Sequence, residues 1–134
     1  MNRAGEPTWR SAISRAYYGA FHCAQEFLVE DLGITELKSG KTGSKHFMVQ
    51  QLLKYTDQPV AIEAAHRLEA LREHRNSADY DLDDGSAGTQ TLSKHAHWEA
   101  VKISDLLRQC AGLDDRAKDE MRTNIEKSRK IRGI

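Results

Sequence analysis

Two arginines and an aspartate stand where an alanine-rich helix should bury its side chains. On a helical wheel of 100° per residue with Ile62 at the origin, Arg75 falls at about 220°, Arg72 at about 280° and Asp79 at about 260°. The apolar residues of segment 59–79 fill one arc of the same wheel, from about 160° to 300°: Ala61, Ala64, Ala65, Leu68, Leu71 and Ala78. Two guanidinium groups and a carboxylate therefore leave the predicted helix on the side that faces other protein.

An arginine in such a place needs acceptors, because its guanidinium does not lose its proton. One interpretation is a structural ion pair that joins the helix to the acidic turn after it, with Asp79 or Asp81 as the partner. Another is a cleft floored by Arg72 and Arg75 that receives an anion such as a phosphate. The residues alone leave both interpretations open. Glu99, at the edge of the inner face of a later predicted helix, is a further candidate partner for either arginine.

Metal chemistry is not predicted for this chain. The aspartates of segment 79–84 alternate as calcium ligands can, but the fixed loop of a helix-loop-helix calcium site, with its closing glutamate, is absent. His95 and His97 are two positions apart, which places them about 200° from each other on a helix, so they cannot ligate one ion together. We expect no metal and no cofactor.

Composition limits the class of protein. The 134 residues suit a single domain, 1–134, in which we expect segment 1–7 to be flexible and segment 127–134 to form a basic tail. The 20 basic and 20 acidic residues cancel, so any anion site must be local rather than spread over the surface. No membrane span or secretory signal is recognisable. The two cysteines are predicted to be small buried residues in a reducing compartment. We therefore expect a cytoplasmic protein.

Five helical segments should position these residues. The first runs over 9–31, with a continuous apolar side, and a glycine-rich loop over about 32–43 follows it. Ser44 is a candidate cap for a short second helix with His46 in its first turn. The alanine-rich segment starting at Pro59 is the third.

The last two segments carry their own start and stop signals. Thr89 or Thr91 could cap the fourth helix, which Gly112 should end, and Asp114 should cap the fifth. The fold class that follows is all-α, an up-and-down bundle of four long helices with a shorter one.

Two predicted helices also carry aromatic residues on their outer faces. Tyr18, flanked by Arg15 and His22, lies opposite the apolar side of the first helix, and Trp98 and Val101 point away from the inner face of the fourth. Tyr18 is either a lone exposed ring or part of a second contact surface. The extra apolar surface leads us to expect a homodimer.

Segments 14–24 (SRAYYGAFHCA) and 75–81 (RNSADYD), with His46 between them, resemble the HEPN superfamily, the higher eukaryotes and prokaryotes nucleotide-binding domain. The similarity covers about residues 9–110 and is strongest to small stand-alone prokaryotic members. It implies a helical bundle that dimerises so that the third-helix motifs of both subunits line one cleft. Many members are metal-independent endoribonucleases that act as toxins or in antiviral defence.

The catalytic signature of that family is an arginine, a polar residue and, a few positions later, a histidine. Arg75 and Asn76 match the first two, but the position of the histidine holds Tyr80. Metal-free cleavage of RNA needs a proton acceptor, a proton donor and positive charge for the phosphorane. A tyrosine with a pKa near 10 is a poor base at neutral pH, so His46 or another histidine would have to substitute.

Two hypotheses remain. In the first, the chain is a dimeric ribonuclease or toxin-like effector, in which Arg75, Asn76, Tyr80 and His46 act on the scissile bond, and Arg72, with Arg15 and Tyr18, binds RNA. In the second, the cleft is catalytically idle and the dimer is a nucleotide-binding or protein-interaction module. For either, the resemblance implies a partner of the nucleotidyltransferase fold.

Overall fold

The computed structural model describes the backbone of residues 5–38, 42–80 and 86–133 and the side chains of residues 11–38, 45–76 and 91–133. This part of the chain is helical and contains no strand, which confirms the all-α prediction. The elements are α1 (Gly5–Glu26), a π-helical turn η1 (Phe27–Asp31), a 3₁₀ turn η2 (Thr35–Lys38), α2 (Thr42–Tyr55), α3 (Pro59–Tyr80), α4 (Ser86–Ala111) and α5 (Asp115–Arg132).

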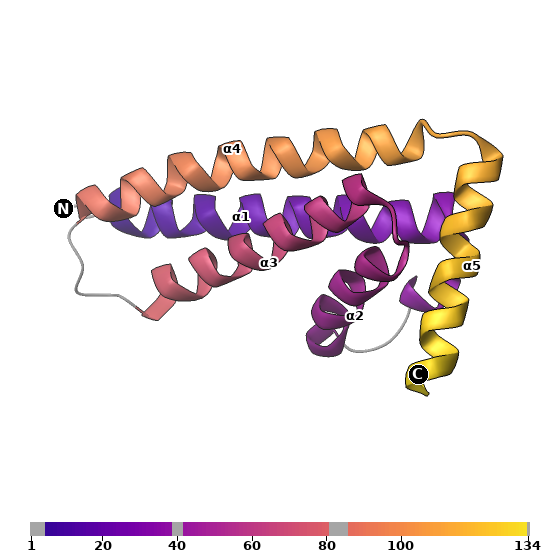
Figure 1. Cartoon of the computed structure of the whole chain (residues 1–134). Coiled ribbons are helices and arrows are strands. Elements are labelled where there is room, and N and C mark those ends of the chain that lie inside the picture. Colours follow the sequence, from indigo (N-terminus) through magenta and orange to yellow (C-terminus); the bar gives the residue numbers. More distant parts are fainter. Residues whose placement is uncertain (1–4, 39–41, 81–85, 134) are drawn as a thin grey trace.

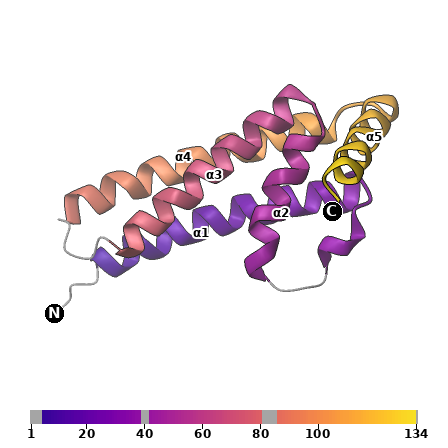
Figure 2. The ribbon, with the colours of Figure 1, turned by 60° about the horizontal axis from the view of Figure 1, so that its bottom comes forward.

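Three long helices form the body of the molecule (Figure 1). α4 lies along α1, and α3 packs against both, as the turned view in Figure 2 also shows. α3 buries three alanines in its first half, and the buried side chains of α1 and α4 include larger ones: Ala61, Ala64, Ala65, Ile13, Tyr17, Phe21, Ile103 and Leu107. The small residues let α3 approach α1 and α4 closely. In the C-terminal half of α3, Arg75 lies next to Tyr17 and Tyr18 of α1.

α2 and α5 depart from a simple up-and-down arrangement. α2 packs against α3, and α5 runs across the end of the bundle instead of along it (Figures 1 and 2). Only Met121 and Ile125 of α5 are buried. Arg122 donates from Nη2 to the carbonyl of Asp31 over 2.9 Å and from Nε to that of Leu32 over 3.1 Å, so polar contacts at the end of η1 determine where α5 docks.

The joint between α2 and α3 is closed by its own hydrogen bonds. The buried hydroxyl of Thr56 donates to the carbonyl of Leu53 over 2.7 Å and accepts from the amide of Gln58 over 3.2 Å. Asp57 has a left-handed backbone with φ of 56°, a conformation that short polar residues tolerate better than others. Asn124 of α5 donates to the carbonyl of Thr56 over 3.0 Å, which ties the crossing helix to this joint.

Several predicted boundaries need correction. α1 begins at Gly5, ahead of the predicted start at residue 9. α5 runs through Arg132 and so includes the basic residues near the C-terminus; Arg129 pairs with Glu36 over 2.7 Å, and the Arg132 guanidinium lies 5.2 Å from the ring centroid of Tyr55. The expected loop over 32–43 contains the turn η2, and α4 starts at Ser86, ahead of both threonines considered as caps.

Of the two cysteines predicted to be buried, Cys110 is buried but Cys23 is exposed. Other predictions hold. α3 begins at Pro59 as expected, and the carboxylate of Asp114 accepts from the amide of Ala117 over 2.9 Å as the cap of α5. No helix in the described ranges is both long and apolar enough to cross a membrane.

Candidate anion-binding site

α1 contributes an aromatic ridge to the candidate site. Tyr17 and Phe21 are four residues apart and therefore project from the same face, where both are buried. Tyr18 is half-buried beside them, with its ring centroid 5.3 Å from that of Tyr17. His22 is exposed at the edge of the ridge, 5.5 Å from the ring of Phe21.

His46 of α2 inserts into this ridge and is only 4% exposed. Its ring centroid lies 4.3 Å from that of Phe21 and 5.7 Å from that of Tyr18. Its Nδ1 is 2.6 Å from the hydroxyl oxygen of Tyr17, a short hydrogen bond between two buried groups. The histidine that the sequence placed at a helix start is therefore anchored inside the protein.

α3 brings two guanidinium groups to the same place. The Arg75 guanidinium carbon lies 5.0 Å from the ring centroid of Tyr18 and 5.7 Å from that of Tyr17, a cation–π arrangement. Arg72, one turn earlier, has a buried Nε that finds no hydrogen-bond partner among the described residues. A buried guanidinium nitrogen without an acceptor is costly, so the place suits an anionic guest.

The electrostatics of the site oppose further positive charge. The pKa of His46 lies below its ordinary value of 6.5, first because of burial and then because of the charges of Arg72, Arg75 and His22. Burial raises the pKa of Tyr17 to about 12, against the opposing effect of the two arginines. At neutral pH the imidazole is therefore neutral and the phenol keeps its proton.

The direction of the hydrogen bond between Tyr17 and His46 determines whether His46 can act as a base. If Tyr17 donates to Nδ1, then Nε2 carries a proton and the ring has no free base. If Nδ1 carries the proton and donates to Tyr17, then Nε2 has a lone pair that can accept one. The geometry thus provides positive charge, an aromatic surface and one neutral imidazole, a set suited to holding a phosphate group.

The structure brings together only part of the predicted site. Arg72, Arg75, Tyr18 and His46 meet as described. Asn76 is exposed on α3 beyond them. Arg15 is exposed on α1, where it lines a separate hollow between α1 and α4 with Lys94, His97 and Trp98. The side chains of Asp79 and Tyr80, and Asp81 as a whole, lie outside the described residues.

The prediction that Glu99 pairs with Arg72 or Arg75 is corrected. Its two carboxylate oxygens accept from Nη1 of Arg67 over 3.0 and 3.2 Å, and Arg67 also binds Glu63 over 2.9 Å. Arg67 leaves α3 toward α4, whereas Arg72 and Arg75 lie against α1 and α2. The spacing of Glu63 and Arg67, four residues apart, could have revealed the pair that these two residues form, but not the pair of Arg67 with Glu99 on another helix.

Sequence reasoning also missed what Tyr17, Phe21 and His22 contribute. The first two were assigned to the core, correctly, but their contact with a histidine of another helix depends on how α1 and α2 cross. No spacing within one segment reveals such a contact.

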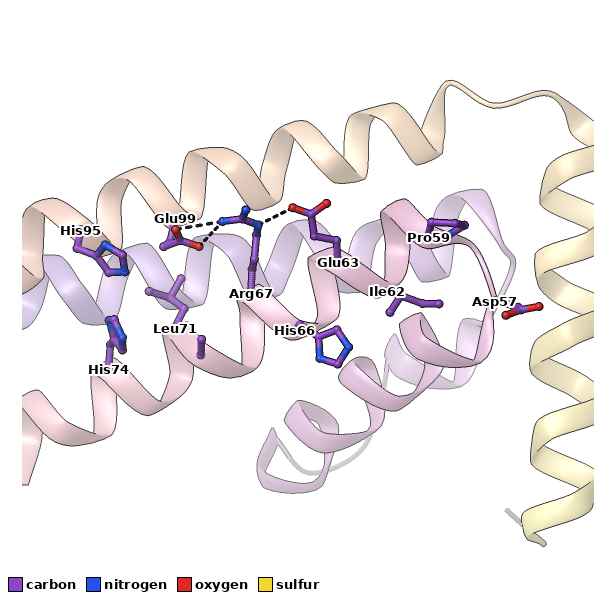
Figure 3. A pocket seen from close by; sticks show the side chains of 11 residues that line it. Asp57, Pro59, Ile62, Glu63, His66, Arg67, Leu71, His74, His95 and Glu99 are labelled. Carbon is purple, nitrogen blue, oxygen red and sulfur yellow. Dashed lines mark hydrogen bonds and ion pairs between the residues drawn. The ribbon is translucent and has the colours of Figure 1, made fainter.

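A groove lies on the other side of α3, between α3 and α4 (Figure 3). It encloses about 760 Å³ and is lined by residues of both helices and of the α2–α3 joint. Its polar lining includes the ion pairs of Arg67 and two histidines, His74 and His95, whose rings face each other.

Among the residues that the structure describes, no group of three or more His, Cys, Asp or Glu side chains could hold a metal ion. No family model, no curated protein and no solved structure matches this chain.

Proposed function

We propose that the chain is a HEPN-like RNA-binding protein that holds a backbone phosphate at Arg72 and Arg75 and, as a dimer, cleaves RNA without a metal ion. The observation that carries the proposal is the convergence of two α3 guanidiniums on an aromatic pocket in which Arg72 Nε has no acceptor among the described residues. A phosphate oxygen would provide that acceptor, and Tyr18 offers a ring on which a base can stack.

The cleavage step would be a transphosphorylation. A base removes the proton of the 2′-hydroxyl, and the 2′-oxygen attacks phosphorus. The bond from phosphorus to the 5′-oxygen breaks as that oxygen takes a proton from solvent water, which produces a 2′,3′-cyclic phosphate and a 5′-hydroxyl. Arg72 and Arg75 would stabilise the charge that develops on the phosphorane. His46 Nε2 would be the base, in the tautomer whose Nδ1 donates to Tyr17.

One observation favours the second candidate function. His46 is 4% exposed, so a substrate hydroxyl reaches it only if α2 shifts or the motif of the other subunit completes the pocket. Without either, the pocket binds RNA or a nucleotide and does no chemistry. The protein is then a binding module in a toxin–antitoxin or defence pair with a nucleotidyltransferase-fold partner. Either function places it in the cytoplasm, where RNA is available.

The binding claim is tested by fluorescence anisotropy with a labelled single-stranded RNA. Replacing Arg72 with alanine should weaken binding by about 10- to 100-fold, since a hydrogen bond to a charged group contributes about 1.5–3 kcal/mol. Arg116→Ala, which removes the same charge from an exposed position on α5, is the matched control and should change affinity little. Equal losses in both variants, or no binding by the wild type, would overturn the proposal.

Cleavage is tested by incubating total RNA with the protein in EDTA. Products that form in EDTA, carry 2′,3′-cyclic ends and disappear in Arg75→Ala and His46→Gln support the enzyme. If the Arg72-dependent binding persists but no product forms, the chain is the binding module instead.

A further inference from the structure

The groove between α3 and α4 holds a pair of histidines that the proposed RNA site does not use. His74 comes from α3 and His95 from α4, and their rings face each other across the groove (Figure 3). The ring centroids are 4.8 Å apart and the ring planes are inclined by 33°. His95 is exposed and His74 is half-buried, so the pair is open to solvent on one side.

This separation fits two imidazoles that share one metal ion. With metal–nitrogen distances near 2.0–2.1 Å and an angle between 90° and a tetrahedral value, the centroids of two ligating imidazoles lie about 5 Å apart. The ligands come from two helices that pack against each other, so the fold holds them in place before any ion binds.

One ring nitrogen of His74 makes no hydrogen bond to the described residues around it. Nδ1 of His74 is buried and has no hydrogen-bond partner among the described residues. The nearest carboxylate in the groove, on Glu99 one turn after His95, is already bound by Arg67. If the ion binds Nε2, the other nitrogen of His74, the proton of the neutral ring resides on Nδ1.

We propose that His74 and His95 together bind one divalent transition-metal ion of the kind that prefers imidazole, such as Zn²⁺, Ni²⁺ or Cu²⁺, with water in the remaining positions. The groove, at about 760 Å³, has room for those waters. The ion would clamp the C-terminal half of α3 to α4. This proposal concerns the opposite side of α3 from Arg72 and Arg75 and stands whether or not the chain binds RNA.

The test is isothermal titration of untagged protein with ZnCl₂, together with the melting temperature in its presence. We expect one equivalent to bind and the melting temperature to rise, because an ion that binds only the folded chain stabilises it. His95→Ala and His74→Ala should each weaken binding by more than about tenfold, since even loss of an outer-sphere partner of a ligand costs that much. His95 is exposed, so we expect its replacement to leave the fold intact. The His95 variant therefore tests the proposal even if replacing the half-buried His74 destabilises the protein.

Three controls isolate the pair. His66→Ala removes another histidine that lines the same groove, His97→Ala removes the next histidine along α4, and Cys23→Ser removes an exposed thiol that can itself bind zinc. All three should bind zinc like the wild type. Absence of binding, or an affinity that His95→Ala leaves unchanged, would overturn the proposal.

Discussion

At the scale of single residues, the hydrogen bond between Tyr17 and His46 determines the character of the pocket. Two arginines lie close to a histidine that is 4% exposed, and the protein accommodates them by keeping that histidine neutral. A protonated imidazole there would face burial and like charge together. The two permanent cations therefore disfavour a third positive charge in the pocket as long as no anion is bound there.

This predicts a pH dependence of stability. Since the pKa of His46 is lower in the folded chain than its ordinary 6.5, the unfolded chain takes up the proton first as the pH falls. The contribution of His46 is complete above about pH 7 and is lost progressively below 6.5, with a slope of at most about 1.4 kcal/mol per pH unit. Urea denaturation at intervals from pH 7.5 to 5.0 measures it.

The control is His46→Gln, which keeps a hydrogen-bonding side chain but does not titrate. Its free energy of unfolding should change less over the same range. Glu36, whose carboxyl pKa is lowered by its hydrogen bonds with Arg129, contributes only at more acidic pH and does not interfere. Equal slopes in the wild type and the variant would mean that other groups cause the dependence.

At the scale of elements, local signals predicted the helices well and their arrangement poorly. Pro59 and Asp114 mark the starts of α3 and α5 because each residue acts within its own first turn. The crossing of α5 depends instead on Arg122 meeting two carbonyls at Asp31 and Leu32, some ninety positions away in the chain. Such a contact leaves no mark in the periodicity of either segment.

The cap of α5 gives a prediction at this scale. Asp114→Ala should remove the acceptor for the Ala117 amide and lower the free energy of unfolding by about 1 kcal/mol. Asp114→Asn should restore most of that loss, because asparagine caps about as well. Urea denaturation measures the loss, and hydrogen exchange should show faster exchange in the first turn of α5. A loss that asparagine fails to recover would point to the charge of Asp114 instead of its cap.

At the scale of the whole molecule, the outer face of α4 remains to be explained. Trp98 is 69% exposed and Val101 is 39% exposed, three residues apart on one side of the helix. Both were predicted to point away from the core, and the structure places them so. The proposed dimer would cover them.

We therefore predict that sedimentation of the wild type gives a mass near twice 15.1 kDa, and that Trp98→Glu shifts it to the monomer mass. A charge buried in an apolar interface weakens association by several kcal/mol. Ile131→Glu is the control, since Ile131 is 85% exposed at the end of α5, away from α4. A wild-type monomer at micromolar concentration would contradict the composite cleft that the RNA proposal needs.

The candidate site was predictable only in part, for the same reason as the fold. The helical wheel singled out Arg72 and Arg75 because charge on an apolar arc is visible within one segment. It did not show that Tyr17 and His46 would meet them, nor that Glu99 would choose Arg67, because these contacts join different helices. The residue types within one segment were enough to identify α3 as unusual. Which residues of other helices contact its arginines depends on tertiary packing.

α3 is one continuous helix. The candidate anion-binding site lies on one side of it and the groove with His74 and His95 on another. Arg72 and Arg75 lie against α1 and α2, while His74, between them in sequence, faces α4. A ligand that shifts α3 when it binds on one side would alter the affinity for a ligand on the other side. Thermodynamic reciprocity then requires the effect to be equal in both directions, so zinc would change the affinity for RNA by the factor by which RNA changes that for zinc.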